Sequence, residues 1–267
     1  MRSTDLSEDV AVVTGGASGI GREISLALAE HGADVVVADV QSEPKDGGTP
    51  THEHITDEIG ETSEYVECDV SDPSDLEVAV DAAEALGGVT VMVNNAGISR
   101  SDDFLDISEA QFDRMMEINA KGVFFGSQTA AQRMVDADRA GSIVNIASIS
   151  GVTGRATGAH YCATKGAVRL MTYAMAAALG PHGIRANAVC PGLIDTPLTR
   201  QDLGAVGEDA AAAQAYEATT PLRRVGQPQD IADAVLYLAS PLSGYVNGES
   251  IIVDGGATNT WSGVADE

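Results

Sequence analysis

A chain of 267 residues that is 44% hydrophobic can bury the core of a single domain. Its 40 acidic and 15 basic residues give a net charge of −25, which would repel nucleic acids and anionic membranes. No apolar run reaches the length of a membrane span, and the first nine residues are polar. We therefore expect a cytoplasmic protein with the acidic surface that is typical of salt-adapted organisms.

Strand-like apolar runs alternate with helix-like stretches from the start of the chain. Val10–Thr14 reads as a strand and Gly19–His31 as a helix, because its apolar residues recur at helical spacing. A second buried strand follows at Asp34–Asp39, and Gln41–Gly60 reads as a proline- and glycine-rich loop before a short acidic helix.

The same alternation continues to the end of the chain. Further strands are expected at Tyr65–Cys68, Val89–Asn94, Ser142–Ala147, Ala186–Cys190 and Ser250–Val253. Further helices are expected at Asp75–Leu86, Glu109–Met134, Tyr161–Leu179 and Gln229–Ala239. This pattern predicts a single α/β domain with a doubly wound parallel sheet of Rossmann type, whose ligands bind at the carboxyl ends of the strands.

A glycine-rich segment, TGGASGIG at residues 14–21, lies between the first strand and the first helix. Glycines there permit a tight turn and let the backbone approach a pyrophosphate, while the helix N-terminus supplies free N–H groups. An ordinary turn is the alternative, but the position between strand and helix favours a dinucleotide site.

The second strand ends at Asp39, whose carboxylate could accept hydrogen bonds from the adenosine ribose hydroxyls. It would repel a 2′-phosphate, so we predict NAD as the cofactor in preference to NADP. The alternative is an aspartate that merely ends the strand and forms a turn. Arg22 could partly offset the repulsion.

Tyr161 and Lys165 are four residues apart on a predicted helix, so their side chains share a face. We expect the ammonium to lower the pKa of the phenol, so that Tyr161 exchanges a proton with an alcohol or ketone. Ser148 ends a strand and could donate a hydrogen bond to the substrate oxygen. Each residue alone could be structural, but Lys165 is one of only three lysines in the chain.

The order and spacing of five motifs resembles the short-chain dehydrogenase/reductase family over about Val10–Gly256. These are TGGASGIG at 14–21, NNAG at 94–97, Ser148, YCATK at 161–165 and PG at 191–192. The resemblance implies one Rossmann-type domain across residues 1–267 and a homotetramer formed through the helices that hold Asn119 and Tyr161. The sequence contains no internal repeat.

The resemblance also implies roles for individual residues. Asn119 would hold a proton-relay water, Lys165 would also bind the nicotinamide ribose, and Asn95 would lie near the adenosine ribose. The implied catalytic residues are Asn119, Ser148, Tyr161 and Lys165. The implied cofactor-binding residues are Gly15, Ser18, Gly19, Ile20, Gly21, Asp39, Asp69, Val70, Asn95, Ala96, Gly97, Tyr161, Lys165, Pro191, Gly192, Ile194 and Thr196. For Asp69 a helix-capping role is the alternative.

The predicted activity is NAD-dependent interconversion of a secondary alcohol and a ketone by hydride transfer, with Tyr161 as acid and base. A sugar, sugar acid or other small polyol is the favoured substrate. A 3-oxoacyl thioester or a simple secondary alcohol is the alternative, although residues 198–219 carry no acyl-chain signature. An epimerase or dehydratase on the same fold, and an NAD-binding redox sensor without catalysis, are the competing functions.

Several other residues invite a functional interpretation. Arg155 lies between Ser148 and Tyr161 and could bind a substrate carboxylate, although a packing or subunit-interface role is the stronger alternative. His160 is expected to have a structural or pocket-rim role. The three cysteines, Cys68, Cys162 and Cys190, have no metal-site spacing and read as small buried residues, and no metal is predicted. The four phenylalanines are expected in the core: Phe104, Phe112, Phe124 and Phe125.

Overall fold

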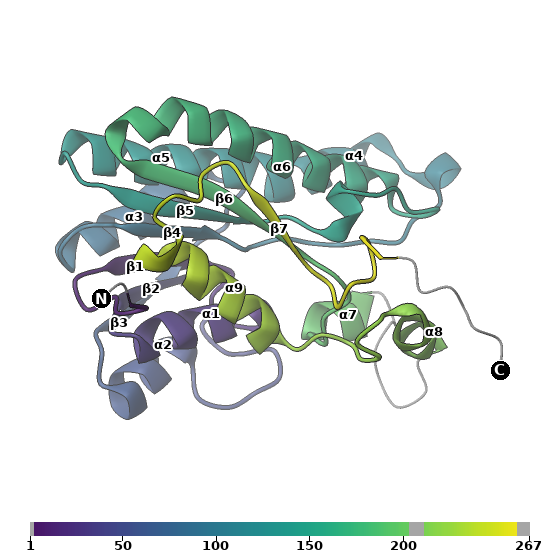
Figure 1. The fold of residues 1–267 in the computed structure, drawn as a ribbon, viewed down its shortest axis with the longest axis horizontal. Helices are drawn as coiled ribbons and strands as arrows, with labels where there is room; N and C mark the ends of the chain where they lie inside the picture. The colour runs from purple at the N-terminus through teal and green to yellow at the C-terminus, as the bar shows by residue number, and fades with distance from the viewer. Residues whose placement is uncertain (1–2, 203–210, 261–267) are drawn as a thin grey trace.

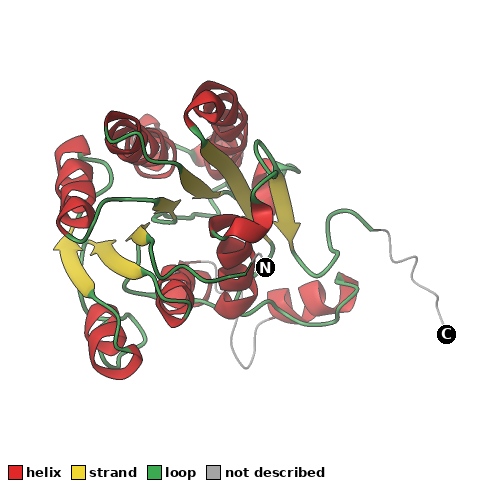
Figure 2. Ribbon diagram, turned by 60° about the vertical axis from the view of Figure 1, so that its left-hand side comes forward, coloured by secondary structure: helices red, strands yellow, loops and turns green. Residues whose placement is uncertain are grey.

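Seven parallel strands form one sheet in the order β3-β2-β1-β4-β5-β6-β7 (Figures 1 and 2). The computed structural model describes residues 3–202 and 211–260. The strands are β1 Val10–Thr14, β2 Asp34–Asp39, β3 Ser63–Glu67, β4 Val91–Asn94, β5 Gly141–Ile146, β6 Ile184–Pro191 and β7 Ser250–Val253. The predicted single-domain Rossmann-type α/β fold is confirmed.

Helices cover both faces of the sheet. They are α1 Gly19–Glu30, α2 Thr51–His54, α3 Pro73–Ala85, α4 Glu109–Met116, α5 Gly122–Asp136, α6 Ala159–Leu179, α7 Pro197–Asp202, α8 Ala211–Thr219 and α9 Pro228–Ala239. In Figure 1, α1, α2 and α9 lie on one side of the sheet and α3, α5 and α6 on the other.

The buried β-branched residues explain this arrangement. β1 is buried along its whole length, and alternate residues of a strand point to opposite faces. Val13 packs into the cluster that contains Ile24 of α1 and Ile231 of α9. Val12 packs into the cluster that contains Leu76 of α3 on the opposite face. A strand buried on both faces needs apolar residues at every position, as the run VAVVT supplies.

The strand order reverses beside β1, which pairs with β2 on one side and with β4 on the other. The connections from β1 and from β4 therefore leave the sheet in opposite directions. This opens a crevice at the carboxyl ends of these strands. The glycine-rich segment follows β1 and therefore lies at that crevice.

The structure corrects several predicted boundaries. The helix expected at Glu109–Met134 is divided into α4, a π-helical turn at Glu117–Lys121, and α5. α3 begins at Pro73 rather than Asp75, because Asp72 caps it by accepting a hydrogen bond from the Ser74 backbone. α7 and α8 form within the segment that sequence patterning left without structure. No helix in residues 3–202 and 211–260 is long and apolar enough to cross a membrane.

Candidate active site

A cleft of about 360 Å³ lies at the carboxyl ends of the strands. All the predicted cofactor-binding residues except Gly21 line it, together with Ser148. The cleft residues that sequence analysis did not select are Val40, Lys45, Cys68, Ile98, Arg114, Ile118, Ile146, Ala147, Pro197, Leu198 and Thr199. The site predicted from separate motifs is therefore one continuous surface in the folded chain.

The glycine-rich turn depends on residues without side chains. Gly15 and Gly19 have φ of 65° and 54°, in the left-handed region that glycine adopts without strain. A Cβ at Gly15 would lie 2.8 Å from Asn95 Nδ2, so only glycine fits there. A Cβ at Gly21 would collide with the carbonyl of Gly15. Gly21 thus lets α1 pack against the turn and does not itself line the cleft.

Asn95 stabilises this turn from the end of β4. Its Nδ2 donates to the carbonyl oxygens of Thr14 and Gly15, at 2.9 and 3.2 Å. The Thr14 hydroxyl in turn accepts from the backbone N–H groups of Asn95 and Ala96. These bonds hold the carboxyl ends of β1 and β4 together, so the Asn95 amide that was expected near a ribose is used to shape the turn.

Asp39 lies beside the glycine-rich turn, at the same end of the cleft. Its Oδ2 accepts a hydrogen bond from the backbone N–H of Ala17 at 3.0 Å. Burial raises the pKa of the Asp39 carboxyl, while the hydrogen bond from Ala17 and the charge of Lys45 act in the opposite direction. Arg22, expected as a possible neighbour, donates to the Thr51 hydroxyl instead.

Lys45 lines the cleft but was not predicted as a cofactor-binding residue. It belongs to the long segment between β2 and α2, and its backbone N–H donates to the Ser18 hydroxyl at 2.7 Å. Its ammonium has no hydrogen-bond or ion-pair partner within the described residues. The chain has only three lysines, and this scarcity was the argument for a functional role of Lys165. The same argument could have identified Lys45 from the sequence.

Asp69 and Val70 line the cleft as predicted. The Asp69 carboxylate accepts hydrogen bonds from the Ser71 backbone and hydroxyl and lies 3.4 Å from Arg114 Nη2. Bonding with Ser71 is the main cause that lowers the pKa of Asp69. The capping alternative for Asp69 was wrong, because the N-cap of α3 is Asp72.

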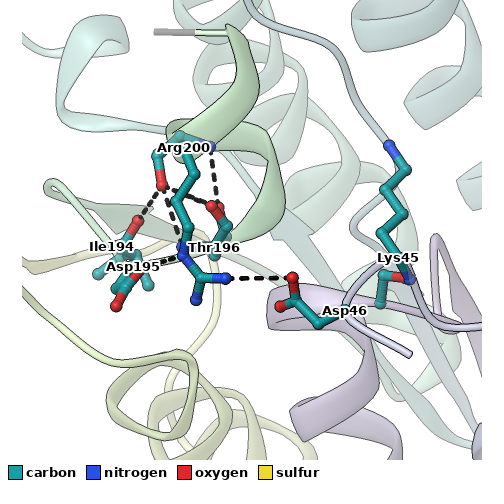
Figure 3. Close-up of polar contacts among 8 residues, drawn as sticks. Lys45, Asp46, Ile194, Asp195, Thr196 and Arg200 are labelled. Atoms are coloured by element: carbon teal, nitrogen blue, oxygen red, sulfur yellow. Dashed lines mark hydrogen bonds and ion pairs between the residues drawn. The ribbon is translucent and has the colours of Figure 1, made fainter. Parts of the chain in front are cut away.

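An ion pair joins two segments at the rim of the cleft (Figure 3). Arg200 of α7 donates through Nε to Asp195 at 2.7 Å and through Nη1 to Asp46 at 3.1 Å. Asp46 follows Lys45 in the β2–α2 segment, so the pair connects the Asp39 side of the cleft to the segment after β6. In Figure 3 the Lys45 side chain points away from this ion pair.

The predicted catalytic side chains converge at the other end of the cleft. Ser148 begins the turn after β5, and Tyr161 and Lys165 lie in the first turns of α6. Lys165 is 4% exposed, and its Nζ donates to the Ile146 carbonyl at 2.8 Å and lies 5.7 Å from the Tyr161 ring centroid. Burial lowers the pKa of Lys165 to about 8.

The pKa of Tyr161 departs from the expectation. Burial of the phenol raises its pKa, while a hydrogen bond with Ser148 and the charge of Arg155 act in the opposite direction. The pKa is therefore raised, and not lowered as expected from the Lys165 ammonium, because desolvation penalises the phenolate.

Asn119 lies behind these residues in the π-helical turn and is fully buried. Its Oδ1 accepts from the Ile98 backbone N–H, and its Nδ2 donates to the Ile98 carbonyl, both at 2.8 Å. Nδ2 also lies 3.3 Å from the Thr164 hydroxyl on α6. Asn119 therefore ties the segment after β4 to the helix that carries Tyr161, although it does not line the cleft.

Other predicted residues have mixed outcomes. His160 is buried, as a structural role requires, with Nε2 3.3 Å from the Asp102 carboxylate.

Of the phenylalanines, Phe125 packs against the core, but Phe104, Phe112 and Phe124 are exposed, so the expectation of a core position was wrong for these three. Cys68 and Cys190 are buried and Cys162 is half-buried. Within the described ranges, no cluster of His, Cys, Asp or Glu could hold a metal.

The fold and this cleft define a nucleotide-binding oxidoreductase. A glycine turn that admits no Cβ brings backbone N–H groups to a ligand, as a pyrophosphate requires, and Asp39 lies where a ribose would follow. The residues therefore fit a nicotinamide dinucleotide along the whole length of the cleft.

Comparison with known proteins agrees with this class. A family model described as enoyl-(acyl carrier protein) reductase matches residues 15–258. L-rhamnose 1-dehydrogenase (NAD(P)(+)) from Sphingomonas sp. strain SKA58 is 39% identical over 252 residues, which are 94% of this chain and 96% of that protein. The chain belongs to the short-chain dehydrogenase/reductase family.

Two solved structures of relatives have the same fold. A short-chain type dehydrogenase/reductase from Mycobacterium marinum is 38% identical with a TM-score of 0.86, and the match covers 96% of this chain and 98% of that one. A candidate 2-deoxy-D-gluconate 3-dehydrogenase from Agrobacterium tumefaciens with bound NADP is 33% identical with a TM-score of 0.84, covering 95% and 98%.

Proposed function

We propose that the protein oxidises a secondary alcohol to a ketone, or catalyses the reverse reaction, with NAD as the preferred cofactor. The observation that carries this proposal is the convergence of Ser148, Tyr161 and Lys165 at one end of a cleft whose other end is formed by the glycine-rich turn and Asp39. A redox sensor that only binds NAD would have no need of all three side chains.

The nicotinamide, when bound, supplies the acceptor or donor of hydride. Ser148 donates a hydrogen bond to the substrate oxygen and orients it toward Tyr161. Tyr161 removes the hydroxyl proton during oxidation and returns it during reduction. Lys165 holds a positive charge beside the phenol and favours the phenolate. Asn119 fixes the backbone at Ile98 and holds the water through which the proton reaches solvent.

The preference for NAD rests on Asp39. The charge of Lys45 offsets part of the charge of this carboxylate. The carboxylate would still repel a 2′-phosphate, whereas it could accept hydrogen bonds from two ribose hydroxyls. The relatives described above use NAD(P) or hold NADP, so this preference is a property of the present chain to be measured.

The substrate class that we propose is a sugar, a sugar acid or another small polyol. The names of the relatives, an L-rhamnose dehydrogenase and a candidate deoxygluconate dehydrogenase, support this class. The alternative is a 3-oxoacyl thioester, which is reduced rather than oxidised. The matching family model is described as an enoyl-(acyl carrier protein) reductase, whose substrate is also an acyl thioester, although it is an alkene and not a ketone.

We also propose a homotetramer with two-fold symmetry. Phe124 on α5 is 42% exposed and Leu170 on α6 is 69% exposed, so these two helices leave apolar side chains uncovered in a single chain. Apolar residues exposed on adjacent helices are typical of an interface between subunits.

A spectrophotometric assay tests the proposal. The wild-type protein is incubated with NAD or NADP and with L-rhamnose, gluconate, 2,3-butanediol and 2-propanol, and reduced cofactor is measured by absorbance. Reduction of acetoacetyl thioester by NADH is measured in parallel. We expect reduced cofactor with at least one hydroxylated substrate and faster reaction with NAD. Absence of turnover in every combination, with NADH binding intact, would indicate the redox sensor instead.

A further inference from the structure

The guanidinium of Arg155 lies over the ring of Tyr161, with its carbon 5.3 Å from the ring centroid. Arg155 belongs to the segment between Ser148 and α6, so the two residues that would hold the substrate oxygen flank it in the chain. A positive charge therefore lies beside the reacting end of the cleft, in addition to the buried Lys165.

Among the described residues of this acidic protein, the Arg155 guanidinium has no hydrogen-bond or ion-pair partner. Within residues 3–202 and 211–260, only Arg155 and Lys45 have charged groups without a hydrogen-bond or ion-pair partner. Every other described lysine and arginine has at least one. The five N–H donors of the exposed Arg155 therefore have no acceptor among the described residues.

The nearby carboxylates do not satisfy Arg155. The facing segment after β4 carries Asp102, but its Oδ2 accepts from Arg100 Nε at 3.1 Å and Gln111 Nε2 at 3.3 Å. The same oxygen lies 3.3 Å from Nε2 of the buried His160. Oδ2 of Asp102 thus already accepts two hydrogen bonds, and no carboxylate among the described residues pairs with Arg155.

The backbone leaves room for this arginine conformation. Gly158 has φ of +73°, and a Cβ there would lie 2.7 Å from Arg155 Nη2. The turn is held by a hydrogen bond from the Gly158 N–H to the Asp102 carbonyl at 2.9 Å. Glycine at this position therefore permits both the turn into α6 and the position of the guanidinium above Tyr161.

We propose that Arg155 binds a carboxylate of the substrate, so that the protein acts on hydroxy acids such as sugar acids in preference to neutral alcohols. This inference rests on the proposed function and specifies the substrate class of the same site. The planar guanidinium forms paired hydrogen bonds with a carboxylate, which a point charge does not. With the hydroxyl at Ser148 and Tyr161 and the carboxylate at Arg155, the two groups must be separated by a short carbon chain.

The net charge of the whole chain makes a local positive charge important for binding an anion. A net charge of −25 would repel an anionic substrate from the surface. A guanidinium at the reacting end, with no ion-pair partner among the described residues, offsets that repulsion locally. A neutral sugar or a long acyl thioester would gain nothing from it.

Matched acid and amide substrates test the proposal. We would measure kcat/KM for gluconate against gluconamide and for 3-hydroxybutanoate against 3-hydroxybutanamide, at one fixed KCl concentration. The proteins are the wild type, Arg155→Met, Arg155→Lys and the control Arg133→Met, which removes the same charge from α5, where Arg133 pairs with Asp81. The acid-to-amide ratio is the readout, because any effect of Arg155 on Tyr161 alters both substrates equally.

We expect the wild type to favour the acid in at least one pair, and Arg155→Met to lower the ratio about 10- to 100-fold, as hydrogen bonds to a charged group contribute. Arg155→Lys should keep part of the ratio, and Arg133→Met all of it. An unchanged ratio in Arg155→Met, a wild-type preference for the amide, or oxidation of neutral sugars without either acid would overturn the inference. Failure of the wild type on every alcohol would instead remove the proposed function on which it rests.

Discussion

Lys165 gives a prediction whose magnitude follows from the structure. The side chain is almost completely buried, and burial lowers its pKa from 10.5 to about 8. A difference of one pKa unit corresponds to about 1.4 kcal/mol, so holding this ammonium charged in the folded protein costs about 3 kcal/mol. Lys165→Met keeps the length of the side chain and removes the charge.

The sign of the pH dependence follows from proton binding. Between pH 8 and 10.5 the unfolded chain binds more protons at Lys165 than the folded chain does. The buried ammonium therefore destabilises the folded protein fully below pH 8, and this destabilisation disappears as the pH rises from 8 to 10.5. The free energy of unfolding of the wild type, minus that of Lys165→Met, should therefore increase by about 2 to 3 kcal/mol between pH 7 and 10.

Urea unfolding at constant salt measures this difference at each pH. The other titrating groups are common to both proteins, so they largely cancel in the subtraction. Lys121→Met removes an exposed ammonium that donates to the Ser71 carbonyl, and serves as the control. For Lys121→Met we expect the difference in the free energy of unfolding from the wild type to stay constant from pH 7 to 10. A difference for Lys165→Met that is equally constant would refute the claim that burial lowers the pKa of Lys165.

Three further predictions concern the cofactor and the surface. Asp39→Ala should narrow the preference for NAD over NADP in kcat/KM by about tenfold or more, because it removes a like charge; a wild type that prefers NADP would contradict this. Asp46→Asn should speed dissociation of NADH a few-fold in stopped-flow fluorescence by weakening the ion pair with Arg200, whereas Asp81→Asn, at a remote surface pair, should not. The melting temperature should rise between about 0.1 and 2 M KCl as screening increases, and a flat or falling series would refute this.

Local patterns predicted most of the fold. Val10–Thr14 and Asp34–Asp39 were predicted with the observed bounds, because continuous β-branched runs between turn residues are typical of strands buried on both faces. The division of the long Glu109–Met134 helix was not predicted. A π-helical turn at Glu117–Lys121 has no signature in hydrophobic periodicity, and its position depends on Asn119 bonding to a segment after β4.

The lining of the cleft was predictable where residues follow a strand directly, as Asp39 and Ser148 do. Lys45, which lines the cleft, and Arg200, which follows the cleft residue Thr199, were missed because both belong to segments whose path depends on tertiary contacts. The Asp46–Arg200 pair joins positions 154 residues apart, a distance over which periodicity carries no information. The exposed phenylalanines were misplaced for a related reason, because composition alone does not distinguish a core residue from an exposed one.

The central claim is that Tyr161 transfers the proton of a dehydrogenase, and Tyr161→Phe tests it most directly. The variant keeps the ring and removes the proton carrier, so turnover on the best substrate should fall by at least about 10²- to 10⁴-fold. Binding of NADH, measured by fluorescence titration, should remain within the wild-type range. Turnover close to that of the wild type would contradict the account, whereas loss of turnover with cofactor binding intact is the result that it predicts.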